Sequence, residues 1–239
     1  GRLMRFGLRD HLLMFLQGAC LFSLNYLLFY ITELTLTSGL AAVIFSTLVV
    51  MNMLNGIIFL KNRFELRMGV GACLGLAGIV LVFWPEITDF ETGDENLTAA
   101  AIAVLATFLA SLGNIASARN QHNGVPVMEA NTYGMTYGAL LMLALSFASG
   151  KEFTIEMTTS YIGSLLFLSV FASILAFLSY LTLLGRVGVE RAAYATLLFP
   201  LVALGISTVF EGYHWSAYAG IGVALILTGN LLILKRSSS

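Results

Sequence analysis

The sequence contains few charged residues for its length. Only 10% of its 239 residues are Asp, Glu, Lys or Arg, whereas 58% are hydrophobic. A soluble domain carries roughly 25% charged residues, so this chain has too little polar surface to cover a water-facing globule. With 12 basic against 13 acidic residues the net charge is −1, which argues against a nucleic-acid partner.

Residues that perform catalysis or bind metals are also scarce within the apolar segments. The two cysteines, Cys20 and Cys73, both fall in such segments, where thiols act as small packing residues, so we predict no metal site. No cluster of His, Asp, Glu or Cys lies in the middle of an apolar segment, which argues against an enzyme. The sequence has no phosphate-binding loop of the Walker type, so we expect no direct use of ATP and no cofactor.

What the sequence does contain is a series of long uncharged windows. Each is long enough, at about 1.5 Å per residue, to cross a hydrocarbon core of roughly 30 Å. The windows lack the alternating pattern of membrane β-strands, so helices are the expected spanning element. We therefore predict an all-α integral membrane protein with eight transmembrane helices, within residues 11–32, 34–60, 68–85, 96–118, 130–150, 157–185, 192–210 and 212–234.

Basic residues are distributed unevenly between the segments that connect these windows. If the N-terminus is cytoplasmic, the inner segments hold eleven Lys and Arg residues and the outer segments hold only Lys151. Acidic residues show the opposite bias, with five of them at positions 86–95. We therefore predict a multi-pass chain with both termini in the cytoplasm.

The chain also resembles itself at an offset of 151 residues. The offset aligns LAAVIF at 40–45 with RAAYAT at 191–196, and three glycines with three others: Gly69, Gly71 and Gly78 with Gly220, Gly222 and Gly229. Under the predicted topology the aligned halves run in opposite directions across the membrane. Inverted repeats are typical of secondary transporters, whose binding site lies between the two halves. We predict a three-helix repeat at 1–95 and a five-helix repeat at 96–239, parts of a ten-helix, 5+5 fold.

The second half carries a recognisable pattern, ERAAYATLLFPLVALGISTVFEG followed by YAGIGVALILTGNLLIL. It resembles the drug/metabolite transporter superfamily, and within it the bacterial EamA-type transporters. Small residues, a proline in mid-helix, a glutamate at the helix end and a glycine-spaced last helix carry the resemblance. It implies a transporter of the bacterial inner membrane, with the first two helices of the family fold lacking from this chain.

Polar residues recur at helical spacing along the apolar windows, and in lipid such residues face a cavity or a neighbouring helix. We take them as candidate substrate-binding residues: Asn25, Ser46, Asn52, Thr107, Ser111, Asn114, Ser173, Tyr180, Tyr194 and Thr196. The alternative is that they only join helices through hydrogen bonds. No carboxylate or lysine lies in mid-window, so neutral or zwitterionic small molecules suit this lining best.

Pro200 interrupts the interior of an apolar helix, where a proline removes a backbone hydrogen bond at a cost of about 3 kcal/mol. We predict a hinge beside the substrate cavity, with a fixed packing kink as the alternative. Glu129 and His214 are candidates for proton coupling, and interfacial anchoring is the alternative for both. The glycines at 71–78 suit either a homodimer face or packing within the chain.

These observations together predict a secondary active transporter in the lipid bilayer. It would export small metabolites such as amino acids, purines or related amphiphiles by alternating access, with proton coupling. A membrane scaffold without transport activity and a passive facilitator are the alternatives.

Overall fold

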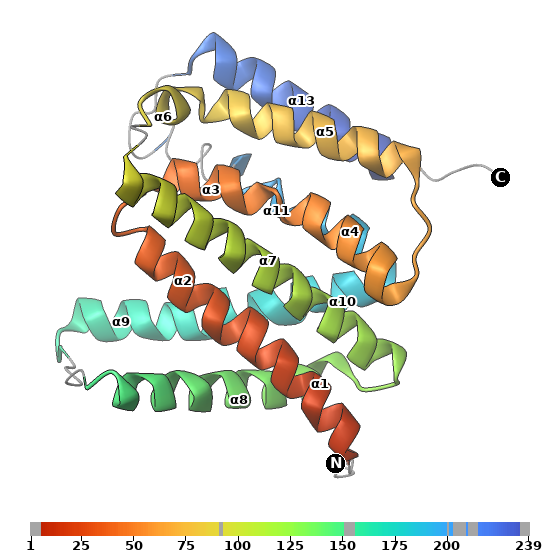
Figure 1. Ribbon diagram of the computed structural model, residues 1–239, viewed down its shortest axis with the longest axis vertical. Helices are drawn as coiled ribbons and strands as arrows, with labels where there is room; N and C mark the ends of the chain where they lie inside the picture. Colours follow the sequence, from red (N-terminus) through yellow and green to blue (C-terminus); the bar gives the residue numbers. More distant parts are fainter. Residues whose placement is uncertain are drawn as a thin grey trace.

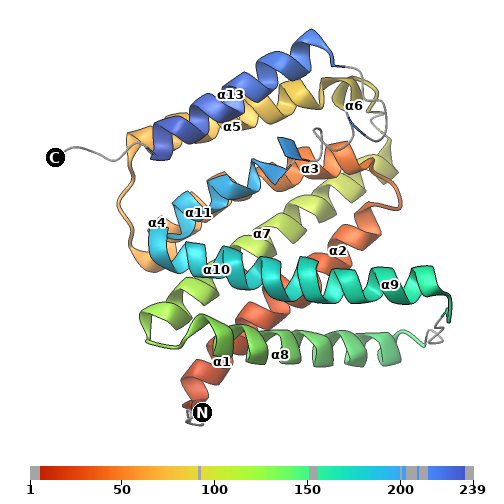
Figure 2. The same cartoon turned by 180° about the vertical axis from the view of Figure 1, so that it is seen from behind.

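The computed structural model describes residues 6–90, 93–150, 156–199, 201–202, 209 and 215–234. All regular elements in these residues are helical, which confirms the all-α prediction (Figures 1 and 2). In chain order they are α1 (Leu8–Ala19), η1 (Cys20–Leu24), α2 (Asn25–Thr32), α3 (Ser38–Ser46), α4 (Leu48–Leu60), α5 (Leu66–Val82), α6 (Trp84–Thr88), α7 (Asp94–His122), α8 (Val127–Ala148), α9 (Thr159–Phe167), η2 (Leu168–Leu175), α10 (Ala176–Val187), α11 (Val189–Thr196) and α13 (Ala217–Leu234). The η segments are single stretches of π-helix that continue the neighbouring α-helices.

Four of the helices are both long enough and apolar enough to cross a membrane. They are the continuous helices Leu8–Thr32, Ser38–Leu60, Asp94–His122 and Thr159–Val187. The helices Leu66–Val82 and Ala217–Ile233 are apolar but shorter, and α8 is long but carries more polar residues. The described residues thus contain fewer full-length spans than the eight predicted.

The helices form a flat stack in which sequence-distant segments lie side by side. Helices α5 and α13 form an antiparallel pair at one edge, and α8 lies beside α9 and α10 at the other (Figures 1 and 2). Helix α7 runs through the centre, where it packs against α1, α2 and α4. This central position of α7 brings its polar residues within reach of both halves of the chain.

Glycines allow α5 and α13 to pack at very short distance. A Cβ atom added to Gly78 would lie 2.5 Å from the carbonyl oxygen of Gly222, and one added to Gly222 would lie 2.5 Å from that of Gly78. Gly71 faces Gly229 in the same way, since a Cβ on Gly229 would lie 2.8 Å from the Gly71 carbonyl oxygen. Backbone contact of this kind needs residues without side chains. These glycines therefore pack helices within one chain.

The 151-residue spacing seen in the sequence reappears in the helix boundaries. Helices α1 and α9 begin 151 residues apart, as do α3 and α11, and α5 and α13. The π-helical segments η1 and η2 overlap at the same offset. The break between α3 and α4 at Thr47 likewise corresponds to the turn at Leu197 and Leu198 that ends α11.

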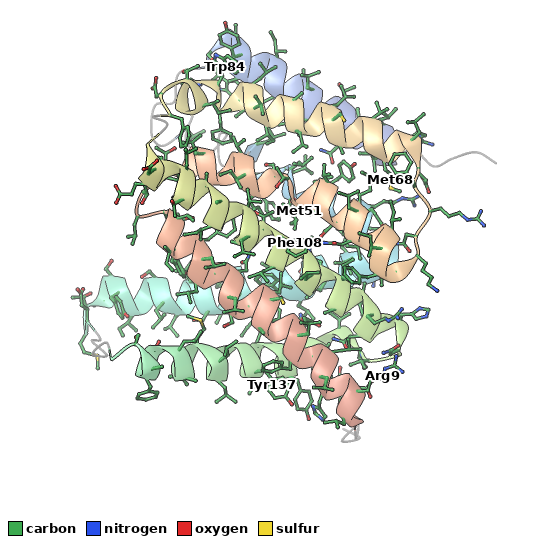
Figure 3. All side chains as sticks on the ribbon, viewed as in Figure 1. Arg9, Met51, Met68, Trp84, Phe108 and Tyr137 are labelled. Atoms are coloured by element: carbon green, nitrogen blue, oxygen red, sulfur yellow. The ribbon has the colours of Figure 1, made fainter. Side chains whose placement is uncertain are left out.

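Charged residues divide the molecule into two ends. Lys61, Arg67, Arg119, Arg186 and Arg191 lie where α4, α5, α7, α10 and α11 meet at one end, here called the basic end (Figures 1 and 3). The opposite, acidic end holds the C-terminus of α2 with Glu33 and the N-terminus of α7 with Asp94 and Glu95. Lys and Arg are thus concentrated at one end of the molecule, which is the asymmetry that the positive-inside rule uses to predict orientation in the membrane.

Candidate functional site

A cavity of about 490 Å³ lies between α2, α3, α7, α10 and α11. It extends from Asn114 and Tyr180, in the middle of the bundle, to Glu33 and Ser38 at the acidic end. Its volume falls in the range of small-molecule sites, which are concave, mostly apolar and provided with a few polar groups. We refer to Asn114, Tyr180 and the residues beside them as the floor, and to Glu33 and Ser38 as the mouth.

The floor consists of neutral polar side chains, and one further polar side chain lies behind it. Asn114 of α7 donates a hydrogen bond of 3.1 Å from Nδ2 to the hydroxyl oxygen of Tyr180 on α10. Oδ1 of Asn114 is buried and has no hydrogen-bond partner. Asn52 of α4 is fully buried near the Tyr180 hydroxyl, and neither its Oδ1 nor its Nδ2 makes a hydrogen bond. A buried amide group without a hydrogen-bond partner costs free energy, so these atoms are unusual features of the site.

Aromatic side chains form the walls of the cavity. Tyr26 and Phe177 meet edge to face at 6.4 Å between ring centroids, and Phe29 and Phe45 do so at 5.5 Å. Tyr30 and Phe199 complete the aromatic lining. On α2 the residues Tyr26, Phe29, Tyr30 and Glu33 follow one another at helical spacing, which places them on one face. The walls therefore offer ring faces and edges to a flat apolar ligand.

Buried polar contacts close the path between the floor and the basic end. Gln121 of α7 donates from Nε2 to the carbonyl oxygen of Leu181 on α10, at 3.0 Å. Nearby, Asn120 donates to Gln17, and Gln17 donates to Asn131, each at 3.0 Å. These bonds join α1, α7, α8 and α10 below the floor.

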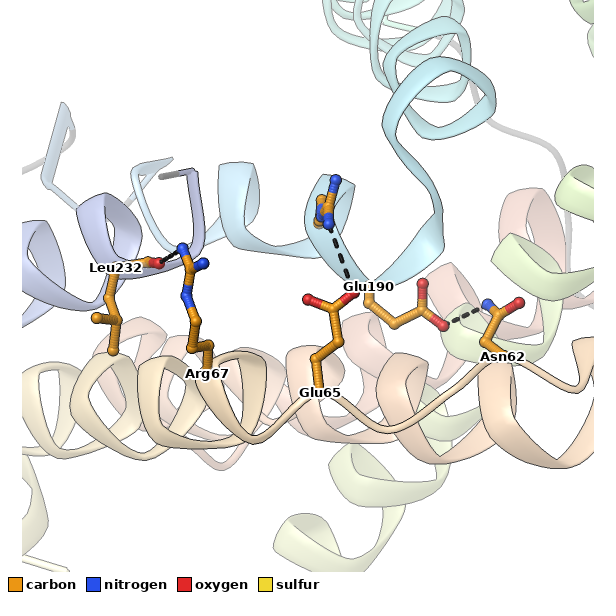
Figure 4. A network of polar contacts seen from close by, with 6 residues as sticks. Asn62, Glu65, Arg67, Glu190 and Leu232 are labelled. Carbon is orange, nitrogen blue, oxygen red and sulfur yellow. Dashed lines mark hydrogen bonds and ion pairs between the residues drawn. The ribbon is translucent and has the colours of Figure 1, made fainter. Parts of the chain in front are cut away.

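A second set of contacts joins the two halves of the chain at the basic end itself (Figure 4). Nδ2 of Asn62, which follows α4, donates to Oε1 of Glu190 in the first turn of α11 at 2.5 Å. Arg191 lies 3.6 Å from Glu65 in an ion pair, and Arg67 donates to the carbonyl oxygen of Leu232 on α13 at 2.7 Å. We call this set the basic-end contacts. Together with the buried bonds they close one end of the bundle while the cavity extends to the other.

Four of the ten candidate substrate-binding residues line the cavity: Asn25, Asn114, Tyr180 and Thr196. Asn25 donates from Nδ2 to the carbonyl oxygen of Ala106 at 3.0 Å, which fixes its amide between α2 and α7. The Thr196 hydroxyl donates to the carbonyl oxygen of Ala193 at 2.6 Å, so its oxygen keeps a free lone pair. The structure brings these four residues, from four different helices, around one space.

The other six candidates do not belong to the cavity lining. Ser46 and Thr107 donate to carbonyl oxygens four residues earlier in their own helices, those of Ala42 and Ala103. Ser111 accepts a bond of 2.8 Å from Nδ2 of Asn55, and thereby joins α7 to α4.

The remaining three candidates lie in different surroundings. Tyr194 is buried in the apolar core and donates to the carbonyl oxygen of Met68 at 2.5 Å. Asn52 lies behind the floor, and Ser173 is half-exposed on η2. Of these, Asn52 comes within reach of the Tyr180 hydroxyl.

The predicted hinge and coupling residues lie away from what the structure describes of the site. Pro200 and His214 fall outside the described residues. Glu129 is half-buried in the first turn of α8, a helix that contributes nothing to the cavity lining.

Sequence reasoning missed the aromatic walls and the mouth of the cavity. The residues Phe29, Tyr30, Phe45, Phe177 and Phe199 read as ordinary apolar positions in a membrane helix. The signal that could have found part of them is the face formed by Tyr26, Tyr30 and Glu33, at a spacing of four and then three residues.

A helical membrane protein that encloses a cavity with a polar floor, open toward one end and closed at the other, has the features of a small-molecule transporter. Comparison with known proteins supports this class. The EamA-like transporter family matches residues 97–235. The chain belongs to this family, and it is a membrane transporter and not an enzyme.

Individual relatives are distant but similar over most of the chain. Protein PagO of Salmonella typhimurium is 23% identical over 95% of this chain and 77% of its own length. The uncharacterized transporter YvbV of Bacillus subtilis is 25% identical over 90% of this chain and 70% of its own. A Salmonella typhimurium protein named probable amino-acid metabolite efflux pump is 25% identical over 84% of this chain and 69% of its own length.

Among solved proteins, a crystal structure with the same fold is also similar to this chain. It superimposes with a TM-score of 0.78 over 92% of this chain and 75% of its own, at 17% sequence identity. At this identity the likeness supports the arrangement of the helices alone.

Proposed function

We propose that this chain is a secondary active transporter that exports small metabolites across the bacterial inner membrane by alternating access. The observation that carries the proposal is the one-sided cavity: it extends to the acidic end and is closed at the basic end by contacts between the two halves. The positive-inside rule then puts the basic end and both termini in the cytoplasm, so the cavity faces outward. An exporter would release its substrate from this state.

An inverted repeat of the 5+5 kind supports the transport mechanism. Helix starts recur at the 151-residue offset, and both repeats contain a π-helical segment and a helix break at matching positions. The two close glycine contacts between α5 and α13 are also related by this offset: Gly222 is 151 residues after Gly71, and Gly78 is 151 residues before Gly229. Two repeats of equal structure can exchange conformations, which gives the inward-open and outward-open states of a transporter. We assign residues 1–95 to the first repeat and 96–239 to the second.

The packing of equivalent helices supports a ten-helix arrangement. In the apolar stretch of Leu8–Thr32, which packs against α7 and α8, 44% of the residues are buried. In the equivalent stretch of Thr159–Val187 the buried share is 0%. We propose that in the complete fold two further helices, equivalent to α7 and α8, cover this face.

We assign substrate contact to the four lining residues Asn25, Asn114, Tyr180 and Thr196, and a supporting position to Asn52. Ser111 and Tyr194 then join elements through hydrogen bonds, and Ser46 and Thr107 bond to their own helices. We assign no role to Ser173, and the hinge role of Pro200 stays a prediction.

Proton coupling is proposed as the energy source, with Glu129 and His214 as its candidate residues. The lack of a Walker-type phosphate-binding loop in the sequence supports a gradient and not ATP as the energy source, and a passive facilitator would lack any response to the gradient. A transporter whose flux is unchanged when the proton gradient is collapsed would contradict this part of the proposal.

The name of one relative supports amino-acid metabolites as the first substrates to test. We would express the chain in bacteria and profile the metabolites of medium and cells by mass spectrometry, against empty-vector cells and an Asn114→Leu variant. The proposal predicts a metabolite that accumulates outside only with the unaltered chain. Equal profiles, with the protein verified in the membrane, would contradict export and favour a scaffold without transport activity.

A further inference from the structure

The lining of the cavity contains one charged side chain, and its charge is negative. Glu33 lies at the mouth, and no Lys, Arg or His from the described part of the chain lines the cavity. Asp94 and Glu95 lie on the same acidic end, in the first turn of α7. Arg119, Arg186 and Arg191, on the lining helices α7, α10 and α11, lie beyond the lining residues at the basic end. The field at the mouth therefore attracts cations and repels anions.

The aromatic residues next to Glu33 strengthen this preference. Tyr26 and Tyr30 precede it on the same face of α2, and their rings lie 6.3 Å apart. A cation over the face of such a ring is attracted by the ring quadrupole, by about 0.5–1 kcal/mol at an exposed site. An ammonium group held between Tyr30 and Glu33 is thus stabilised both by the aromatic ring and by the carboxylate charge. A carboxylate in the same place is stabilised by neither.

The floor offers hydrogen-bond acceptors more than donors. Asn114 lines the cavity, and its side-chain oxygen Oδ1 is buried and has no hydrogen-bond partner. The Thr196 hydroxyl has already donated its proton to Ala193, so it can only accept. Tyr180 accepts from Asn114 and keeps one proton to donate. A ligand with N–H or O–H groups therefore fits this floor better than one with several acceptors.

We propose that the cavity selects a substrate in which a flat apolar body is joined to a cationic amine, and that Glu33 is the residue that determines this charge preference. The proposal rests on the proposed transport function. It narrows the expected substrate class from neutral or zwitterionic metabolites to molecules with a positive group. The apolar body lies between the aromatic walls, and the amine lies at the mouth. Glu33, the C-cap of α2, lies eight positions after Asn25, about 12 Å along the helix axis. An elongated molecule fits this space.

Three probes with one body and different charge test the proposal. They are 4-phenylbutylamine (cationic), 4-phenylbutanol (neutral) and 4-phenylbutyrate (anionic). Binding to the purified chain in nanodiscs of neutral lipid is measured by isothermal titration, and empty nanodiscs correct for partition into lipid. The variant is Glu33→Gln, and the matched control is Glu95→Gln, a carboxylate at the same end that does not line the cavity.

The expected order is amine, then alcohol, then carboxylate, with the amine about fivefold to tenfold tighter than the alcohol. Glu33→Gln should reduce this ratio to about twofold, because the residual aromatic attraction is small. Glu95→Gln should leave the ratio unchanged, since its charge is solvated and screened. A second variant, Tyr30→Leu, should also lower the ratio while the alcohol keeps its affinity.

Three results would overturn the proposal. They are equal affinity for amine and carboxylate, an amine-to-alcohol affinity ratio that Glu33→Gln leaves unchanged, and no binding of any probe to folded protein. Failure of the transport function gives a different pattern. In that case the probes bind in the expected order, but no probe or metabolite moves across the membrane of proteoliposomes.

Discussion

The side chain of Asn62 donates a hydrogen bond to the carboxylate of Glu190, 128 positions further along the chain. The bond joins the stretch after α4 to the first turn of α11, the helix that begins 151 residues after α3 (Figure 4). Gly56 makes room for it, because a Cβ atom on Gly56 would collide with Oε1 of Glu190. Glu190 is 8% exposed, so its carboxylate depends on this partner. The basic end is therefore closed by a buried contact between the halves.

Loss of the Asn62 amide should cost more stability than loss of the neighbouring ion pair. Asn62→Leu leaves the buried Glu190 carboxylate without its donor, a penalty of about 1–3 kcal/mol. Glu65→Gln breaks an ion pair whose side chains are 43% and 48% exposed, and such pairs contribute about 0–1 kcal/mol. Thermal unfolding in detergent should show the larger decrease in melting temperature for Asn62→Leu. Equal decreases would mean that Asn62 does not hold Glu190 in place.

The close pairing of α5 and α13 gives a second prediction. In Gly222→Ala the new methyl group meets the Gly78 carbonyl oxygen, so the helices must move apart, at about 1–3 kcal/mol. Gly220→Ala, two residues earlier in the same helix, has nothing within 4 Å of the new Cβ and should be neutral or slightly stabilising. Melting temperatures of the two variants check this directly. A Gly220→Ala variant as unstable as Gly222→Ala would refute the packing.

Polar residues of the floor and polar residues between helices should respond differently to substitution. Asn114→Leu removes a group that faces the cavity, so substrate affinity should fall about tenfold or more while the protein stays folded. Gln17→Met instead leaves Asn120 and Asn131 without their partner, and each interhelical bond lost costs about 0.6 kcal/mol.

The prediction is checked by measuring affinity and thermal stability for both variants, with Thr132→Val as control. Thr132 is exposed on α8 and bonds only to its own helix, at the carbonyl oxygen of Met128. If Gln17→Met lowered substrate affinity as much as Asn114→Leu, the assignment of Asn114 to substrate binding and of Gln17 to helix packing would be wrong.

Pro200→Ala should slow turnover and leave assembly intact. The turn before it is already tightened, since Leu197 and Leu198 donate to carbonyl oxygens three residues earlier. Thr47, 151 residues before Leu198, donates from its backbone N–H to the carbonyl oxygen of Ile44 in the same way, without any proline nearby. We therefore expect a decrease in transport rate with unchanged substrate affinity. A variant with the native rate would show that Pro200 is a packing kink.

The sequence was sufficient to predict the helical membrane class, because window length and charge distribution depend on the bilayer and not on tertiary contacts. It also contained the 151-residue offset that the helix starts reproduce. The number of full-length spans was less predictable. Charge-free windows extend into loops and helix breaks, as at Thr47, so the length of a window overestimates the length of the helix within it.

The candidate site was only partly predictable, for a physical reason. A polar residue in a membrane helix can face a cavity, a neighbouring helix or its own backbone, and helical spacing is the same in all three cases. Asn114 faces the cavity, while Thr107, on the same helix two turns earlier, bonds to its own backbone. Aromatic residues such as Phe45 give no sequence signal at all, because lipid and a cavity wall favour them equally.

The central claim is that the cavity is reached from one side of the membrane at a time, and thiol labelling tests it most directly. In a chain without Cys20 and Cys73, one reporter is Ala176→Cys in the cavity, and the other is Ser117→Cys, one turn beyond Asn114 toward the basic end. Membrane-impermeant reagent is applied to each face of vesicles, with and without Asn62→Leu.

We predict that Ala176→Cys reacts only from the outer face and that Ser117→Cys, 1% exposed as serine, is protected. With Asn62→Leu the pattern should reverse in part, so that Ser117→Cys gains inner-face reactivity as Ala176→Cys loses its own from outside. Simultaneous reaction from both faces, or no change with Asn62→Leu, would contradict the account.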